Sequence, residues 1–404
     1  MNVLDKSAIR DCTSCQLCAT VCAHKAIKIE VNENGFYRPV INTNLCNDCS
    51  LCTKICYKFD ETLKITTTEQ LSRQKLYSAW SNDDQLIKST TSGGIGDLLA
   101  HELLKEGYKI VGCVYNDDKV RAEHRIATNE LDLIPFRGSK YIQSYTFDAL
   151  KEVVKNCRNE KYAIFGTPCQ IYALNKIAEM KKNRDNFFFV DLYCHGTPSL
   201  HVWKKFQDNI KKTLSIKHFD RVEFRSKLEG WGGRYLIAIY VDGKIVFRSK
   251  KNLKGFYELF FSDQVLNDGC NKCLLRSTHE YTDIRLGDFW GKKYLDNYRG
   301  VSAVSIITER ATNLFEKIKK QDVTTEPCDY SEFLPFQSWG KIHNPRPISR
   351  TAILLSLKDP KQTIYDACNA LHKTQPLKIK LVRYTKNILA LFPIRAVNML
   401  KKIM

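Results

Sequence analysis

Residues 162–196 read YAIFGTPCQIYALNKIAEMKKNRDNFFFVDLYCHG. The first four of these residues and residues 187–192 are short apolar runs rich in aromatic and β-branched side chains, which is typical of buried strands. Between the two runs, a Gly-Thr-Pro turn precedes a stretch through Met180 that has the apolar periodicity of a helix. A strand, a helix and a strand in this order predict a mixed sheet covered by helices on both faces.

The segments on either side continue this alternation. Residues 75–115 show the pattern of a strand, a glycine turn, a helix and a second strand. Residues 218–250 are typical of antiparallel strands, with Asp242-Gly243 as a hairpin turn. After residue 359 the pattern is mostly helical. We therefore expect an α/β (α+β) fold that contains a mixed sheet and ends in a helical C-terminal tail.

Two short segments near the N-terminus share one cysteine spacing. Residues 12–22 read CTSCQLCATVC and residues 46–56 read CNDCSLCTKIC, so that C-x2-C-x2-C-x3-C occurs twice. In bacterial ferredoxins with this spacing, the fourth cysteine of each run binds the other cluster. The spacing predicts two [4Fe-4S] clusters, one bound by Cys12, Cys15, Cys18 and Cys56 and the other by Cys46, Cys49, Cys52 and Cys22. The alternative is structural zinc, for which paired C-x2-C arms are common.

Four further cysteines lie in distinctive loops. Cys169 and Cys194 each follow a predicted strand, and Cys270-Asn-Lys-Cys273 is a C-x2-C pair suited to chelation. If the fold brings these four thiolates together, they form a third cluster site. The alternative is that Cys169 and Cys194 are ordinary buried thiols, as free cysteines often are.

Two loops have the composition of anion-binding sites. Ser92-Gly93-Gly94 precedes a predicted helix, whose first N–H groups favour phosphate; an ordinary helix cap is the alternative. Residues 137–141, Arg-Gly-Ser-Lys-Tyr, supply two cations, a flexible turn and an aromatic ring, although an ordinary loop has the same composition. His195 is a candidate proton donor, and Asp288 is a candidate for orienting a cofactor or partner; a structural role is the alternative for each.

The composition excludes several classes of protein. With 404 residues, of which 43% are hydrophobic, the chain has material for two or three packed domains and is not a disordered chain. No apolar run reaches the ~20 residues that a membrane span needs. The first residues lack the apolar region of a secretory signal, so the 16 cysteines indicate metal or redox chemistry in a reducing compartment. We expect a cytoplasmic protein.

The order of the motifs resembles a known family. Gly-Thr-Pro-Cys-Gln, Cys-His-Gly-Thr-Pro-Ser, C-x2-C and Gly-Asp-Phe-Trp-Gly follow one another over residues 75–310, after Ser-Gly-Gly and Arg-Gly-Ser-Lys-Tyr. This order resembles the beta-subunit family of coenzyme F420-reducing hydrogenases and dehydrogenases, in which an N-terminal two-cluster ferredoxin is a known fusion. The resemblance implies FAD and at least one four-iron cluster.

The resemblance also implies roles for individual residues. It makes flavin-site candidates of Ser92, Gly93, Gly94, Arg137, Gly138, Ser139, Lys140, Tyr141, Gly166 and Thr167. It also implies that the ligands of the third cluster are Cys169, Cys194, Cys270 and Cys273. The expected domains are a two-cluster ferredoxin at 1–71, the N-terminal and C-terminal parts of the family domain at 72–158 and 159–320, and a helical extension at 321–404.

These features predict an iron–sulfur flavoprotein oxidoreductase that passes electrons between ferredoxin-type clusters and FAD and reduces or oxidises an organic hydride acceptor. The expected donor is a redox partner protein, reduced ferredoxin, a deazaflavin or a nicotinamide. Relatives with the ferredoxin fusion occur in surface-polysaccharide gene clusters, which suggests that biosynthetic setting. One alternative is a non-catalytic electron-relay subunit. The other is a zinc-rich nucleic-acid binder, suggested by the net charge of +19; we expect no nucleic acid, because bound clusters offset part of that charge.

The segment from residue 376 to the end is basic and apolar. It contains seven basic residues and no acidic one: Lys378, Lys380, Arg383, Lys386, Arg395, Lys401 and Lys402. Apolar residues alternate with them, which predicts an amphipathic helix that lies on an anionic membrane surface at the inner face of the membrane. The alternative is a helix packed on the protein's own core with a solvated basic edge.

Overall fold

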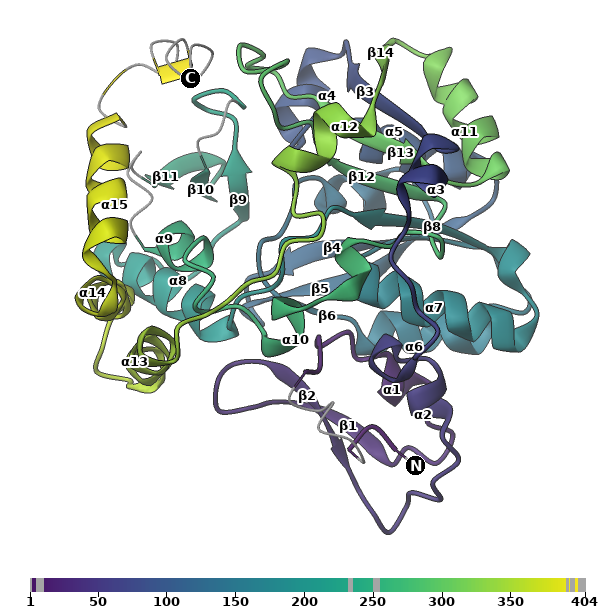
Figure 1. The fold of residues 1–404 in the computed structure, drawn as a ribbon, viewed down its shortest axis with the longest axis horizontal. Coiled ribbons are helices and arrows are strands. Elements are labelled where there is room, and N and C mark those ends of the chain that lie inside the picture. Colours follow the sequence, from purple (N-terminus) through teal and green to yellow (C-terminus); the bar gives the residue numbers. More distant parts are fainter. Residues whose placement is uncertain are drawn as a thin grey trace.

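A computed structural model describes residues 2–4, 11–231, 235–249, 255–389, 392 and 397–398 (Figure 1). Across these residues the chain forms a nine-stranded mixed sheet, a three-stranded sheet and a two-stranded sheet. In Figure 1 the N-terminal unit, with the two-stranded sheet, lies below the large sheet, and α13 to α15 lie at the side of the molecule. The predicted mixed α/β architecture with a helical C-terminal region is confirmed.

The nine strands of the large sheet come from two parts of the chain. In sequence they are β3 (Lys75–Ser81), β4 (Lys109–Asn116), β5 (Arg121–Ala127), β6 (Ser144–Tyr145), β7 (Tyr162–Phe165), β8 (Phe187–Leu192), β12 (Ile284–Asp288), β13 (Ser302–Ile306) and β14 (Val323–Cys328). In space their order is β14-β3-β13-β12-β8-β7-β4-β5-β6. The central strands β12, β8, β7 and β4 are parallel, and antiparallel pairs flank them.

Helices cover both faces of this sheet. Along β8, Phe187 and Phe189 pack into the core that α6 and α7 cover, whereas Phe188 and Val190 pack into the core that α5 and α11 cover. Alternate residues of a strand point to opposite faces, so an unbroken apolar run is what a strand buried on both faces requires. The helices are α1 (Leu17–Thr20), α2 (Leu51–Lys54), α3 (Thr68–Ser72), α4 (Asp84–Ser89), α5 (Ile95–Lys105), α6 (Phe147–Asn156), α7 (Pro168–Lys181), α8 (Leu200–Leu214), α9 (Phe256–Phe260), α10 (Asp268–Asn271), α11 (Glu309–Lys319), α12 (Tyr330–Phe333), α13 (Pro347–Lys358), α14 (Ile364–Thr374) and α15 (Leu377–Leu389).

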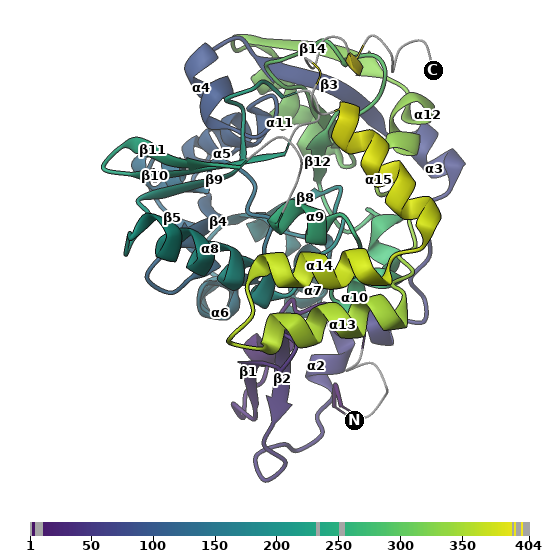
Figure 2. The same ribbon diagram turned by 90° about the vertical axis from the view of Figure 1, so that its left-hand side faces the viewer.

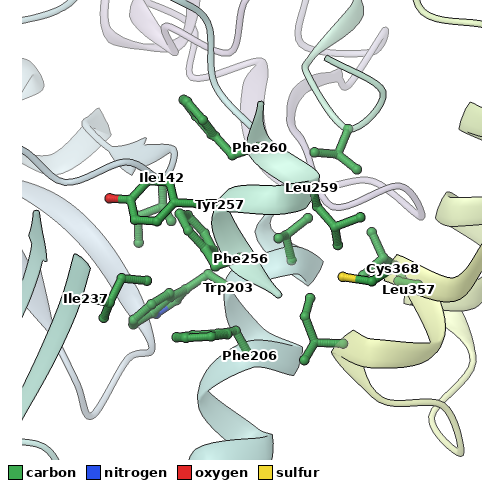
Figure 3. Close-up of a cluster of buried hydrophobic side chains, with 14 of the residues drawn as sticks. Ile142, Trp203, Phe206, Ile237, Phe256, Tyr257, Leu259, Phe260, Leu357 and Cys368 are labelled. Atoms are coloured by element: carbon green, nitrogen blue, oxygen red, sulfur yellow. The ribbon is translucent and has the colours of Figure 1, made fainter. Parts of the chain in front are cut away.

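A second core joins the three-stranded sheet to the C-terminal helices. That sheet contains β9 (Arg221–Ser226), β10 (Leu236–Val241) and β11 (Lys244–Arg248), and the predicted hairpin turn at 242–243 is confirmed. Trp203 of α8 and Phe256 of α9 pack with Leu357 and Cys368 from α13 and α14 (Figure 3). The helices α13 and α14 are therefore part of the folded body.

The end of the chain differs in part from the expected helical extension. Its first segment is β14, which pairs antiparallel with β3 at the edge of the large sheet. This strand was not predicted because its sequence, VTTEPC, lacks the apolar pattern of a buried strand. An edge strand needs little burial and tolerates proline. At the other end, α15 lies on the outside of the molecule (Figure 2). Of the described helices, none is long and apolar enough to cross a membrane.

Candidate functional site

The two cysteine runs of the N-terminal unit share one backbone conformation. Ser14 and Gln16 have φ angles of 66° and 69°, and Asp48 and Ser50, at the equivalent positions of the second run, have 51° and 63°. Left-handed conformations are costly for residues other than glycine and persist where the surroundings require them. Each run then continues into a short helix, α1 or α2. The cysteine repeat is therefore also a structural repeat.

Cys56 lies beside the first three cysteines of the chain. Burial raises the pKa of the Cys15 thiol well above its ordinary value, and the neighbouring thiols of Cys56, Cys18 and Cys12 raise it further. The Ser14 N–H donates to the sulfur of Cys12 at 3.4 Å, and hydrogen bonds of this type stabilise iron-bound thiolates. The structure brings together the first predicted ligand set.

Cys46, Cys49 and Cys52 form a neighbouring group. Burial raises the pKa of Cys52, and the thiols of Cys49 and Cys46 add to the shift. Cys22 packs against the small apolar cluster that contains Cys52. The N–H of Ala26 donates to the sulfur of Cys22 at 3.3 Å. Cys18, which belongs to the first set, packs against the same cluster, so the place of Cys22 in the second set stays a prediction.

The four later cysteines line one cavity, although the first and last of them lie 104 residues apart in sequence. Cys169 is in the first turn of α7, Cys194 follows β8, Cys270 is in α10 and Cys273 follows that helix. Burial raises the pKa of Cys194 to about 12; Cys270 raises it further, and the nearby guanidinium of Arg276 opposes the shift. The fold thus brings together the four thiols of the third predicted cluster site.

The surroundings of this cavity suit sulfur ligands. Thr167 Oγ1 lies 3.3 Å from the sulfur of Cys169, and the Tyr57 hydroxyl donates to the sulfur of Cys273 at 3.3 Å. Thr167 and Gln170 cap the start of α7 reciprocally, which fixes the turn that carries Cys169. Four thiols that line one cavity, with hydroxyl groups at two of the sulfurs, are the donor set of a four-iron cluster. The residues present therefore fit this cofactor.

The N-terminal unit is seated directly against this cavity. Thr13 and Ser14 line both the cavity of the first ferredoxin set and the cavity of the later cysteines. A Cβ atom at Gly269 would lie 2.2 Å from the carbonyl oxygen of Asp11 and 2.7 Å from the carbonyl carbon of Cys12. Only glycine fits there, because the backbone of the N-terminal unit occupies the space of a side chain. The two sets of thiols share one wall.

The first two flavin-candidate loops meet each other. The Ser139 N–H donates to Thr91 Oγ1 at 2.8 Å, which joins the loop at 137–141 to the loop at 91–94. The guanidinium of Arg137 pairs with both carboxylate oxygens of Asp97 at 2.8 and 3.1 Å. Lys140 donates to the main-chain carbonyls of Pro135, Phe136 and Arg137, and burial lowers its pKa to about 8. The cations of this loop are therefore already bound to protein oxygens.

The third pair of flavin candidates lies elsewhere. Thr167 lines the cavity of the later cysteines, and the N–H of Gly166 donates to the carbonyl of Val190. The loop that begins at Arg137 continues to Ile142–Ser144, which lines the same cavity. The segment 137–144 therefore connects the two candidate regions.

A charged and aromatic group surrounds the candidate Asp288 beside these loops, and its other members were not predicted as site residues from the sequence. Arg225 of β9, with a side chain 2% exposed, pairs with Asp288, and Trp231 Nε1 donates to Asp288 at 2.9 Å. The rings of Trp231 and Trp290 stack in parallel with centroids 4.9 Å apart. Lys227 donates to the carbonyl of Ser92, and burial lowers its pKa to about 7. The sequence signal for this group is a pair of basic residues, Arg225 in β9 and Lys227 just after that strand.

Both candidate catalytic residues are held by partners. Asp288 accepts hydrogen bonds from Arg225 and Trp231, as described above. His195 Nε2 lies 3.0 Å from Asp263 Oδ1. These contacts give both side chains a structural role. The candidate role of His195 as a proton donor and that of Asp288 in orienting a cofactor or partner stay predictions.

Two family models match the chain. Residues 76–151 match the N-terminal region of the coenzyme F420 hydrogenase/dehydrogenase beta subunit, and residues 159–330 match its C terminus. The two matches together span more than half of the chain. This protein belongs to the coenzyme F420 hydrogenase/dehydrogenase beta-subunit family, as the order of its motifs suggested. The N-terminal cysteine repeat lies outside both matches.

Individual relatives are distant. The chain is 25% identical over 343 residues to the coenzyme F420-dependent sulfite reductase of Methanocaldococcus jannaschii, covering 82% of this chain and 50% of that protein. It is 27% identical over 123 residues to coenzyme F420 hydrogenase subunit beta of Methanococcus voltae, covering 29% of this chain and 44% of that protein. A structure of the F420-reducing [NiFe] hydrogenase complex from Methanosarcina barkeri aligns with a TM-score of 0.46 and 20% identity, over 78% of this chain and 91% of that one. The chain spans about half the length of the curated relatives it matches.

Proposed function

We propose that the protein is an iron–sulfur flavoprotein oxidoreductase with three adjacent four-iron cluster sites that lead toward a flavin site. One observation carries the proposal: four distant thiols line a single buried cavity, and that cavity shares a wall with the first ferredoxin set. Burial raises the pKa of Cys18 and of Cys169, and a thiol of a neighbouring set adds to each shift: Cys52 of the second set for Cys18, and Cys15 of the first set for Cys169. These contacts support an arrangement of the three thiol sets in a row.

The chain's own residues have distinct roles in this proposal. The N-terminal cysteines would hold two clusters, and Cys169, Cys194, Cys270 and Cys273 would hold the third. Loops 91–94 and 137–141 and the Arg225 group would hold FAD beside the cysteine cavity, to which residues 142–144 extend. Four-iron clusters carry single electrons, and a flavin exchanges these for a hydride, which is the chemistry that the site would supply.

The proposed reaction is electron transfer between a redox partner and an organic hydride acceptor. The relatives include a subunit of coenzyme F420 hydrogenase, which supports a partner protein or a deazaflavin as donor or acceptor. A nicotinamide donor and a role in surface-polysaccharide biosynthesis stay predictions.

Reoxidation of the reduced protein tests this function. The anaerobically purified chain is reduced with dithionite, freed of excess reductant, and mixed with a nicotinamide, a deazaflavin or a nucleotide sugar. We expect one of these compounds to restore the visible absorbance of the oxidised protein within a single turnover, and to do so much more slowly in the Arg225→Met variant. If only a redox protein restores the absorbance, the chain is an electron relay and the enzyme proposal is wrong.

The C-terminal helix α15 supports docking on a membrane. No described side chain of α15 is buried, and Leu377, Leu381 and Tyr384 are 76%, 61% and 67% exposed. With Ile388, they follow the i, i+4, i+7, i+11 spacing of one helix face. This exposure is not that of a helix packed on the protein's own core. We propose that the apolar face enters an anionic bilayer surface, since the segment 376–404 has basic residues and no acidic one.

Part of this segment falls outside the described residues. Arg395, Lys401 and Lys402 are among the positions that the structure does not describe, as are the side chains of Arg383 and Lys386. The proposal therefore rests on the exposed face of α15 and on the charge of the sequence.

A further inference from the structure

Three side chains from distant parts of the chain meet beside the cysteine cavity. His195 follows β8, Asp263 follows α9, and His343 lies between α12 and α13. One ligand atom of each lies within 4.8 Å of the other two. His195 Nε2 is 3.0 Å from Asp263 Oδ1, and His343 Nδ1 is 2.9 Å from Asp263 Oδ2. Two imidazoles and a carboxylate are a donor set that suits Zn²⁺ and Fe²⁺.

The hydrogen bonding of His343 indicates a cation between its Nδ1 atom and the carboxylate of Asp263. Its Nε2 lies 2.8 Å from the carbonyl oxygen of His195, and because a carbonyl only accepts, Nε2 carries the hydrogen. In the neutral ring, Nδ1 then presents a lone pair to the carboxylate of Asp263. Nδ1 is buried and makes no hydrogen bond of acceptable geometry. A lone pair that faces a carboxylate oxygen in a buried site is repulsive unless a proton or a metal ion lies between them.

The second nitrogen of each histidine has a polar partner, and that of His343 is of the type that metal-bound histidines have. Metal-ligating histidines almost always donate their other ring N–H to a carbonyl, carboxylate or water, which orients the ring. His343 Nε2 is bound to the His195 carbonyl, and His195 Nδ1 lies 3.3 Å from the hydroxyl of Ser338. Arg276 also donates to the His195 carbonyl, at 2.8 Å, and to that of Lys341, at 2.8 Å. Of the two ring nitrogens that face Asp263, His195 Nε2 is hydrogen-bonded to the carboxylate and His343 Nδ1 has no hydrogen-bond partner; a metal ion would take both nitrogens as ligands.

We propose that His195, Asp263 and His343 bind one divalent metal ion, with Zn²⁺ as the ion best suited to the site. Phe260 and Phe261 lie against the ring of His195 and shield one side. Lys341 Nζ lies 3.4 Å from Asp263 Oδ2, and its side chain is 43% exposed, so that it competes with the ion and turns into solvent when the ion binds. The ion would fasten the segment of His343 to the loop that carries Cys194.

Metal binding to the cluster-loaded full chain tests this proposal. The protein with its iron and sulfide in place is titrated with Zn²⁺ against a chromogenic chelator. We expect one tight Zn²⁺ per chain, and affinities at least about 100-fold lower in Asp263→Asn and His343→Gln, with unchanged iron content. Ser338→Ala should weaken binding by about 10-fold. The matched control is His218→Gln, because the side chain of His218 is 71% exposed and lies outside the site.

A second readout locates the ion and does not depend on disruptive variants. Crystals of the same preparation should give an anomalous peak at the zinc edge between His195, Asp263 and His343. Lys341→Met, a change at the surface, should tighten Zn²⁺ binding. The proposal is overturned if wild-type protein binds Zn²⁺ no tighter than the Asp263→Asn variant, or if Lys341→Met leaves the affinity unchanged. The three side chains would then be a protonated imidazole–carboxylate network.

Discussion

Cys22 is the residue that best distinguishes a crossed two-cluster arrangement from two independent cysteine runs. It lies four residues after Cys18, and both cysteines pack against the apolar cluster that contains Cys52, so substitutions are needed to assign it. We expect Cys22→Ser to remove about four iron atoms per chain. Adding Cys49→Ser should remove no more iron, whereas adding Cys15→Ser should remove about four further atoms.

Iron and sulfide assays on anaerobically reconstituted variants measure this pattern. The control is Cys328→Ser, since Cys328 lies in β14 and belongs to none of the three thiol sets. If Cys22→Ser with Cys15→Ser loses no more iron than either single variant, the crossed arrangement is wrong.

We expect the buried side chain of Lys227 to make the stability of the fold depend on pH. Burial lowers its pKa to about 7, whereas in the unfolded chain it is near 10.4. Above pH 7 the folded state therefore binds fewer protons than the unfolded state, and this group makes the free energy of unfolding rise with pH, by at most about 1.4 kcal/mol per pH unit. Lys227→Met lacks this rise. The unfolding midpoint temperature of Lys227→Met minus that of wild type should therefore decrease as the pH is raised from 7 to 9.

Scanning fluorimetry at one heating rate across that pH range measures the difference. Lys105→Met is the control, because the side chain of Lys105 is 62% exposed. A constant difference between wild type and Lys227→Met over these pH values would show that Lys227 is not protonated differently in the two states.

At the scale of elements, α10 holds the N-terminal unit against the cysteine cavity. The space for a side chain at Gly269 is filled by the backbone of Asp11 and Cys12. Gly269→Ala should therefore weaken this docking by about 1–3 kcal/mol, as overpacking does. We expect faster protease cleavage in the exposed connector at 60–73. In the control, Gly96→Ala, the nearest atom to the new Cβ is a flexible leucine carbon at 3.4 Å. Equal cleavage of the two variants would contradict the docking.

The strands of the sheet differ in how well their sequences reveal them. The strands β7 and β8 are unbroken apolar runs, because both faces of a central strand are buried, and they were predicted at their observed positions. The edge strand β14 has the polar sequence VTTEPC, and it pairs on one side only. Its segment was expected to be helical because an edge strand leaves little apolar pattern in the sequence.

For the whole molecule, the sequence predicted which cysteines form each cluster site, but it did not predict all of the side chains around those sites. The C-x2-C spacing of Cys270 and Cys273 can be recognised in the sequence, whereas their proximity to Cys169 depends on the order of the strands. The meeting of Arg225 with Asp288, and of Asp263 with His343, depends on long-range packing in the same way. Contacts between distant segments are set by the register and order of the elements, which short motifs do not encode.

The exposed helix α15 gives a prediction for the molecule on a membrane. The full chain should sediment with anionic liposomes at low salt, and a version that ends at Thr374 should stay in the supernatant. Added salt should release the full chain, because each basic residue near the surface contributes about 1 kcal/mol through charge. If both versions stay in the supernatant, the helix has another partner and the membrane proposal is wrong.

The central claim is that the cysteines form three cluster sites in a row beside a flavin site. Its most direct test is the metal and flavin content of anaerobically reconstituted protein, by iron, sulfide, zinc and flavin assays. We expect about twelve iron atoms and one FAD per chain, because twelve cysteines fall into three sets of four. About eight iron atoms, or zinc in place of iron, would contradict the account.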